Sequence, residues 1–263
     1  MKKNLLFRIS LLSAIVLLSS FILLKPKEKP TLFLIGDSTV KNGKGKGDGA
    51  LWGWGSFINE RFDTTKINIE NDALGGTSSR TFRTRGLWDS VLEKIKPGDF
   101  VIMQFGHNDG SPLDDSARAR GTIKGTGDEF KEIYNPITKQ QEVVHTYGWY
   151  LAKIVKEAKD KGAIPIICSL VPRSDWKDGK VKRGEGDYGK WARETALSTG
   201  AYFIDLNTLT ADKYDVLGEA KVSTMFPSDH THTNREGAEI NGASVVEGMK
   251  TIQDLALNQY LIK

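Results

Sequence analysis

Five short, largely apolar runs separated by stretches with helical spacing constrain the fold of this chain most strongly. They occupy residues 31–35 (TLFLI), 67–70 (INIE), 100–105 (FVIMQF), 163–170 (AIPIICSL) and 201–206 (AYFIDL). Continuous apolar runs of this length are typical of strands buried on both faces of a sheet. A parallel connection needs a crossover helix, so this alternation predicts a parallel sheet with helices on both faces.

Two of the connecting helices can be placed from their periodicity. Apolar residues at positions 150, 151, 154, 155 and 158 predict a helix over 149–158, and similar spacing predicts another over 237–257. Thr233 and Glu236 match a capping box that would open the second helix. A chain of 263 residues is long enough to bury most of its apolar surface in a single domain. We expect one doubly wound domain that spans residues 31–263.

The N-terminus has the pattern of an export signal. Lys2 and Lys3 precede an apolar run over 5–24, and a KPKEKP stretch follows at 25–30. The charge-free part, 9–24, is short for a membrane span of about 20 residues, so we expect a cleaved signal peptide over 1–24 and a linker over 25–30. No clear cleavage motif precedes Lys25, so an uncleaved N-terminal anchor stays open. Either case predicts an exported, periplasmic or extracellular protein.

Charge and cysteine content exclude several classes of protein. Three of the 37 basic side chains lie in the first two dozen residues, so the rest nearly balances the 33 acidic ones and no nucleic-acid partner is expected. The one cysteine, Cys168, cannot form an internal disulfide, and no Cys/His spacing builds a zinc site. We therefore expect no metal and no cofactor, with Cys168 as a small core side chain.

Polar residues that could carry out hydrolysis follow the first predicted strand and precede the last predicted helix. Ser38 follows the first predicted strand in a Gly-Asp-Ser turn, which would be unremarkable by itself. Near the C-terminus Asp229 stands three residues before His232. This spacing lets the carboxylate hold Nδ1–H of the imidazole and leaves Nε2 free as a base. Together the three residues predict a hydrolytic triad.

Two further blocks supply hydrogen-bond donors. GHND at 106–109 follows the third predicted strand, and NDALGG at 71–76 follows the second. A glycine N–H can approach a ligand closely, and an asparagine amide donates without carrying charge, so these blocks predict an oxyanion hole. Because the carboxyl ends of parallel strands meet at one edge of a sheet, we expect all four blocks to converge there.

These four blocks resemble those of the SGNH, or GDSL-like, hydrolases. The chain is more specifically similar to rhamnogalacturonan acetylesterases through IGDST at 35–39, GWG at 53–55, NDALGG at 71–76, FGHND at 105–109 and FPSDHTH at 226–232. The resemblance covers 31–257 and implies a three-layer α/β/α flavodoxin-like sandwich with a five-stranded parallel sheet. It also implies a serine esterase that uses no metal.

The resemblance assigns roles by position. Ser38 would be the nucleophile, His232 the general base and Asp229 its orienting partner, while the N–H groups of Ser38 and Gly76 and the Asn108 amide would bind the oxyanion. The implied function is removal of O-acetyl groups from a plant polysaccharide, above all acetylated pectin (rhamnogalacturonan). Acetylated xylan or a bacterial glycan, a lipase or thioesterase with an apolar acyl channel, and a non-catalytic glycan-binding protein remain alternatives.

Basic residues point to an acidic polymer. Arg118, Arg120 and Lys124 lie within the long polar segment 110–144, and a second basic stretch spans 173–183. Arginine can bind a carboxylate through two parallel hydrogen bonds, so we expect Arg118 and Arg120 to contact a uronate, although a solvated surface is the plainer interpretation.

His230 is a further candidate for substrate contact. It could instead join Asp229 and His232 as a metal ligand, since two imidazoles and a carboxylate make a plausible coordination set. That interpretation would leave Ser38 and Asn108 without a function.

Overall fold

Five parallel strands form the central sheet of this computed structural model, which describes residues 28–184 and 186–262. They are β1 (Thr31–Gly36), β2 (Asn68–Asn71), β3 (Phe100–Gln104), β6 (Ile164–Cys168) and β9 (Tyr202–Ile204). The spatial order is β2-β1-β3-β6-β9, which is the flavodoxin-like order of a doubly wound sheet. All five predicted strands are present, and the predicted α/β fold class is confirmed.

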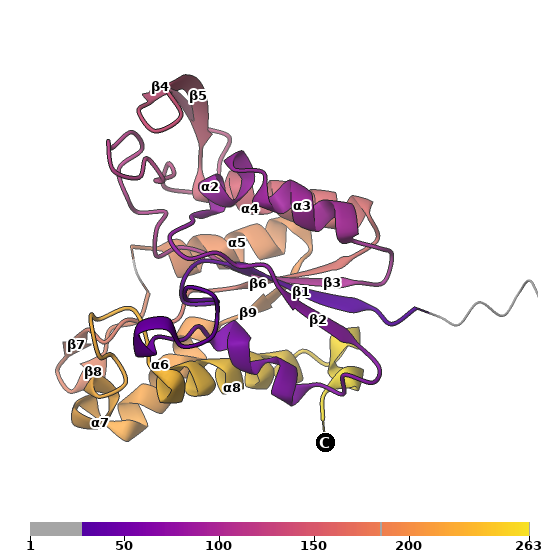
Figure 1. Ribbon diagram of the computed structural model, residues 1–263, viewed down its shortest axis with the longest axis vertical. Helices are drawn as coiled ribbons and strands as arrows, with labels where there is room; N and C mark the ends of the chain where they lie inside the picture. The colour runs from indigo at the N-terminus through magenta and orange to yellow at the C-terminus, as the bar shows by residue number, and fades with distance from the viewer. Residues whose placement is uncertain (1–27, 185, 263) are drawn as a thin grey trace, which may run out of the picture.

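Helices cover both faces of the sheet (Figure 1). One layer holds α2 (Ser79–Thr84), α3 (Leu87–Lys94), α4 (Tyr147–Asp160) and α5 (Tyr188–Thr199). The opposite layer holds α6 (Leu206–Leu217) and α8 (Arg235–Thr251), with the short helices η2 (Trp54–Phe57), α7 (Glu219–Ser223) and η4 (Ala256–Tyr260) beside them. The helix predicted over 149–158 lies inside α4.

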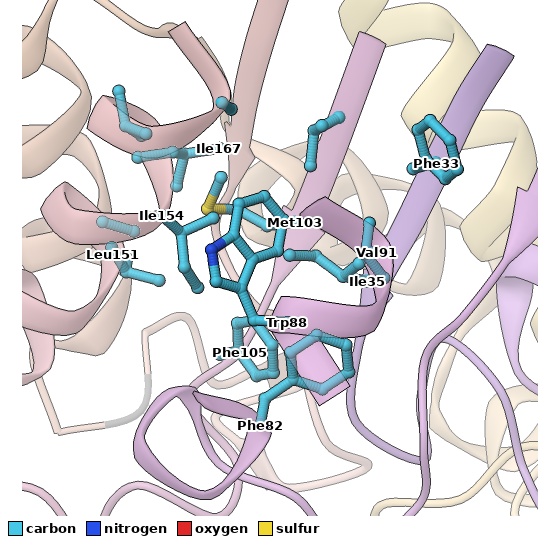
Figure 2. Close-up of a cluster of buried hydrophobic side chains, with 14 of the residues drawn as sticks. Phe33, Ile35, Phe82, Trp88, Val91, Met103, Phe105, Leu151, Ile154 and Ile167 are labelled. Carbon is cyan, nitrogen blue, oxygen red and sulfur yellow. The ribbon is translucent and has the colours of Figure 1, made fainter. Parts of the chain in front are cut away.

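Each face of the sheet has its own apolar core. In β1, Phe33 and Ile35 pack into the cluster beneath α2–α5, whereas Leu32 and Leu34 pack into the cluster beneath α8. This alternation explains why the first strand is apolar at every position from Leu32 to Ile35. Trp88 of α3 is fully buried at the centre of the first cluster, among side chains from β1, β3 and α4 (Figure 2).

The start and the end of the last helix differ from the prediction. Asn234 is the N-cap of α8, and its side-chain oxygen accepts from Gly237 N at 3.1 Å, so the predicted capping box of Thr233 and Glu236 is wrong. The backbone of Thr233 is engaged elsewhere, because its carbonyl accepts from Trp52 N at 2.8 Å. The helix ends at Thr251 rather than 257, and the chain then turns into η4.

The long polar segment 110–144 is not simply a loop. It contains most of an antiparallel hairpin, β4 (Phe130–Asn135) and β5 (Gln140–His145), that stands out from the body above α2 (Figure 1). A much shorter hairpin, β7 (Trp176–Lys177) and β8 (Lys180–Val181), follows β6. Across the described residues, no helix combines the length and hydropathy needed to span a bilayer. The expected signal or anchor over 1–24 lies outside those residues, so it stays a prediction.

Candidate active site

The candidate site is a cleft of about 770 Å³ at the carboxyl ends of the strands. The connections leaving β1 and β3 run in opposite directions along the sheet, and such a switch point is where doubly wound folds bind ligands. Ser38, Gly76, Asn108 and His232 all line this cleft. The structure therefore brings together one residue from each of the four predicted blocks.

A sharp turn after β1 presents Ser38. A Cβ atom on Gly36 would lie 2.4 Å from the carbonyl oxygen of Gln104 and 2.5 Å from Val40, so only glycine fits there. The turn closes immediately, because the N–H groups of Val40 and Lys41 both donate to the carbonyl of Asp37 at 3.1 Å. Ser38 is thus held at the edge of the sheet by backbone geometry.

The side chain of Asp37 fastens this turn to the core. Its Oδ1 accepts from the N–H of Thr39 at 2.9 Å and from the Thr39 hydroxyl at 2.7 Å, yet burial raises the pKa of Asp37 to about 6. Gln104 continues the network by donating to the Thr39 hydroxyl and accepting from Trp54 Nε1 at 2.8 Å. Trp54 is fully buried and serves packing rather than sugar stacking.

The three predicted triad residues are in hydrogen-bond contact. Ser38 Oγ lies 2.8 Å from His232 Nε2, and His232 Nδ1 lies 2.7 Å from Asp229 Oδ2. Burial opposes the charge on Asp229, but hydrogen bonds from the ring and backbone of His232 and from Thr231 N outweigh it and lower the pKa of Asp229 to about 2. The charged carboxylate favours the proton on Nδ1, which leaves Nε2 as an acceptor for the serine hydroxyl.

Two loops carry the predicted oxyanion donors and are tied together by side chains. The Asn108 amide donates to the carbonyl of Thr77 at 2.7 Å, which occupies one of its two N–H bonds. Asp109 accepts from Ser79 N and from Gly106 N, each at 3.0 Å, and burial raises the pKa of Asp109 to about 7. The bonds to Thr77 and from Ser79 join the loop after β3 to the loop after β2 and to the start of α2.

The backbone N–H groups of Ser38 and Gly76 donate to no acceptor within the described part of the chain. Gly76 adopts φ +80°, a conformation that favours glycine. The arrangement is therefore chemically able to polarise an ester carbonyl beside a nucleophilic hydroxyl.

Among the described residues, four arginines and no carboxylate line the cleft: Arg85, Arg118, Arg120 and Arg173. The side chain of Arg118 is exposed and has no partner among the residues described. Arg120 donates through Nη1 to the carbonyl of Gly76 at 3.0 Å and through Nε to Ser111 Oγ at 3.2 Å. Burial and the nearby charge of Arg118 lower the pKa of Arg120. The cleft is strongly cationic.

A buried ion pair holds one wall of this cleft. The side chain of Arg80 in α2 is fully buried and donates to both carboxylate oxygens of Glu142, at 2.8 and 2.7 Å. Its Nη1 also donates to the carbonyls of Leu113 and Gly121, both at 2.8 Å. The segment that carries Arg118 and the β4–β5 hairpin are therefore fixed to the body.

Several other predicted residues lie away from the cleft or play another part. His230 is not among the cleft-lining residues and pairs through Nδ1 with Asp175 at 2.8 Å. In the second basic stretch only Arg173 lines the cleft, and Arg183 pairs with Asp212 and Asp215 instead. No group of three or more metal-ligating side chains occurs in 28–184 and 186–262.

His107 and Arg85 complete the lining. Burial lowers the pKa of His107 to about 3, so its imidazole is neutral beside the cleft. Arg85, at the C-cap of α2, was not predicted from the sequence. No motif marks Arg85 in the sequence, because its place at the cleft depends on how α2 packs.

Comparison with known proteins assigns the family. The model of the GDSL-like lipase/acylhydrolase family matches residues 34–240 of this chain. The chain belongs to this family. The predicted resemblance is confirmed, and the protein is a carboxylic ester hydrolase, as expected from its four blocks.

Relatives of this family member include named acetylesterases. The chain is 30% identical over 249 residues to a rhamnogalacturonan acetylesterase of Emericella nidulans, covering 94% of this chain and 96% of the relative. It is also 30% identical over 238 residues to the probable rhamnogalacturonan acetylesterase YesY of Bacillus subtilis, covering 88% and 97%. The crystal structure of Axe2, an acetylxylan esterase from Geobacillus stearothermophilus, superposes with a TM-score of 0.57 at 18% identity, covering 86% and 96%. That likeness shows the shared fold.

Proposed function

We propose that this hydrolase is a serine esterase that removes acetyl groups from an acidic polysaccharide, with acetylated rhamnogalacturonan as the substrate. The observation that carries the proposal is the contact between Ser38 Oγ and His232 Nε2 at 2.8 Å, on an imidazole held by Asp229. The names of the two relatives at 30% identity support the acetyl ester and the polymer.

The geometry supports a two-step acyl transfer. In the first step Ser38 Oγ attacks the acetyl carbonyl carbon while His232 Nε2 takes the hydroxyl proton. The charge that develops on the carbonyl oxygen is stabilised by the N–H groups of Ser38 and Gly76 and by the Asn108 amide. The sugar oxygen then leaves with the proton from His232, and the acetyl group stays on Ser38.

The second step restores the serine. A water molecule gives one proton to His232 Nε2 and attacks the acetyl-serine carbonyl. The tetrahedral intermediate collapses, acetate leaves, and Ser38 Oγ regains the proton from His232. The charge on Asp229 stabilises the imidazolium in both steps, and the low pKa of Asp229 keeps this carboxylate ionised at neutral pH.

The cationic cleft supports an acidic polymer as substrate. Arg118 and Arg120 carry like charges close together, and none of the described residues that line the cleft is a carboxylate. A uronate carboxylate would relieve that repulsion and accept hydrogen bonds from Arg118. Leu74 and Ile137 are the only large aliphatic side chains in the described lining, which argues against the wide acyl channel of a lipase or thioesterase.

Action on a polymer fits export from the cytoplasm. The positively charged start and the apolar run over 5–24 support secretion or N-terminal anchoring. Expression of the full chain and of a form lacking 1–24, followed by cell fractionation, tests this part of the proposal. Retention of both forms in the cytoplasm would contradict it.

Acetate release from a panel of polysaccharides tests the substrate. Acetylated rhamnogalacturonan should give a higher kcat/KM than acetylated xylan, and Ser38→Ala should abolish release from both. A preference for acetylated xylan would contradict the acidic polymer, and turnover of long-chain acyl esters alone would favour a lipase.

A further inference from the structure

The β4–β5 hairpin carries an unusual concentration of exposed apolar side chains. Phe130 is 61% exposed, Tyr134 56%, Ile137 49% and Val143 46%. These are four of the eight large hydrophobic side chains that are exposed in the described part of the chain. Exposed apolar patches of this kind mark interaction sites.

The register of the hairpin puts three of them on one face. Glu132 pairs with Val143, and Phe130 and Tyr134 lie two residues to either side of Glu132, so their side chains point the same way. The two rings are separated by about 13 Å along the strand, with Val143 between them on the neighbouring strand. On the opposite face the apolar side chains are buried, with Ile133 at 5% exposure and Val144 at 0%.

This hairpin is held firmly against the body. Glu142, on the inner face, accepts both hydrogen bonds from the buried Arg80 and a third from Asn135 Nδ2. The exposed rings therefore stand on a scaffold that is already ordered, so a ligand would pay little entropy to dock there.

The turn of the hairpin reaches the candidate active site. Ile137, in the turn of the hairpin, is one of the residues that line the cleft beside Ser38. A polysaccharide chain is longer than the cleft, so sugar rings next to the acetylated one must pass over its rim. Figure 1 shows the hairpin projecting beyond α2, at the end of the segment that follows β3.

We propose that the outer face of the β4–β5 hairpin, defined by Phe130, Tyr134 and Val143, is a subsite that binds a neutral sugar ring of the polymer outside the cleft. The flat apolar rings suit the apolar faces of a sugar, and Gln141 on the same face offers an amide for hydroxyl groups. Glu132 lies in the middle of this face and would repel a uronate. The proposal rests on the proposed function in that it requires a polysaccharide substrate.

Two substitutions and a matched control test this subsite. Tyr134→Ala and Phe130→Ala should each raise KM for polymeric acetylated rhamnogalacturonan about threefold to tenfold. Both should leave kcat and KM for p-nitrophenyl acetate unchanged, because neither Phe130 nor Tyr134 lines the cleft where that ester binds. Val216→Ala removes an 87% exposed side chain on α6 and should change neither substrate's kinetics.

The outcomes separate this inference from the proposed function. If the wild type deacetylates the polymer and the two variants match it, the subsite is wrong while the esterase stands. If the wild type releases no acetate from any polysaccharide, the proposed function fails and this subsite with it. Sedimentation is run in parallel, and a loss of self-association in both variants with unchanged polymer KM would show that a second copy of the chain covers the hairpin, which also overturns the inference.

Discussion

Arg120 holds the carbonyl oxygen of Gly76, to which its Nη1 donates at 3.0 Å. Gly76 is a proposed oxyanion donor, so this arginine supports the architecture of the site as well as its positive charge. Arg118, two residues earlier, has no side-chain partner among the described residues. The sequence indicates Arg118 and Arg120 as a pair. Because their contacts differ, we expect substitutions of the two arginines to have different effects on activity.

Arg118→Glu should selectively weaken binding of the polymer substrate. We expect KM for acetylated rhamnogalacturonan to rise about tenfold, because a repulsive charge replaces a free guanidinium, while turnover of p-nitrophenyl acetate stays unchanged. Added salt should weaken polymer turnover in the wild type, since the Debye length falls to about 8 Å at physiological ionic strength. Lys177→Glu, in the second basic stretch but outside the cleft, is the control. Unchanged KM in Arg118→Glu would remove Arg118 from the binding site.

Arg120→Gln should impair both substrates. Loss of the bond to the Gly76 carbonyl should lower kcat for p-nitrophenyl acetate as well as for the polymer. Arg120→Lys should retain part of the kcat that Arg120→Gln loses. Steady-state kinetics of the two variants check this, with Arg118→Gln as the matched control. A defect confined to the polymer KM would mean that Arg120 only binds substrate.

The strands and the four blocks were predictable because local pattern and burial agree there. In β1 both faces are buried from Leu32 to Ile35, so these four positions are all apolar, and the polar blocks follow directly at the strand ends. The hairpin was not predictable, because its exposed face carries Phe130 and Tyr134 while its inner face carries Glu142. This inversion of the usual pattern depends on the buried partner Arg80, which is distant in sequence.

The capping box and the cleft arginines show the same dependence on distant contacts. Thr233 fits a cap by sequence, but its hydroxyl donates to the carbonyl of Trp52, 181 residues away, and Asn234 caps the helix instead. Arg85 carries no motif, and only the packing of α2 beside the cleft brings it to the site.

Asn108→Ala should lower kcat with little change in KM. An oxyanion donor acts on charge that develops in the transition state, so its loss costs about 100-fold to 1,000-fold in kcat. The bond from Asn108 to Thr77 orients the amide, and Thr77 keeps its other contacts in the variant. Kinetics with p-nitrophenyl acetate check the prediction, and a rise in KM at constant kcat would assign Asn108 to ground-state binding.

Asp37→Asn should stabilise the protein at neutral pH. Burial raises the pKa of Asp37 from 3.8 to about 6, so above that pH the folded state holds a charge that the unfolded state hydrates freely. The penalty is about 3 kcal/mol above pH 6 and vanishes below pH 3.8. Urea unfolding should therefore show a higher free energy of unfolding for the variant than for the wild type at about pH 8, and no difference at about pH 4. An equal difference at both pH values would contradict the buried charge.

Glu142→Ala should destabilise the fold strongly. It would leave the fully buried guanidinium of Arg80 without its carboxylate, at a cost of about 3–5 kcal/mol in the free energy of unfolding. Glu247→Ala, which breaks an exposed pair with Lys213, should cost less than about 1 kcal/mol. Similar losses in the free energy of unfolding in the two variants would show that the buried charge of Arg80 does not need Glu142 as its partner.

Covalent labelling of the nucleophile tests the central claim most directly. The wild type is treated with an organophosphonate, and the adduct is located by mass spectrometry alongside residual activity on p-nitrophenyl acetate. We expect one adduct per chain on Ser38, loss of activity in proportion to labelling, and neither labelling nor activity in Ser38→Ala. An adduct on another serine, or esterase activity that survives in Ser38→Ala, would contradict the account.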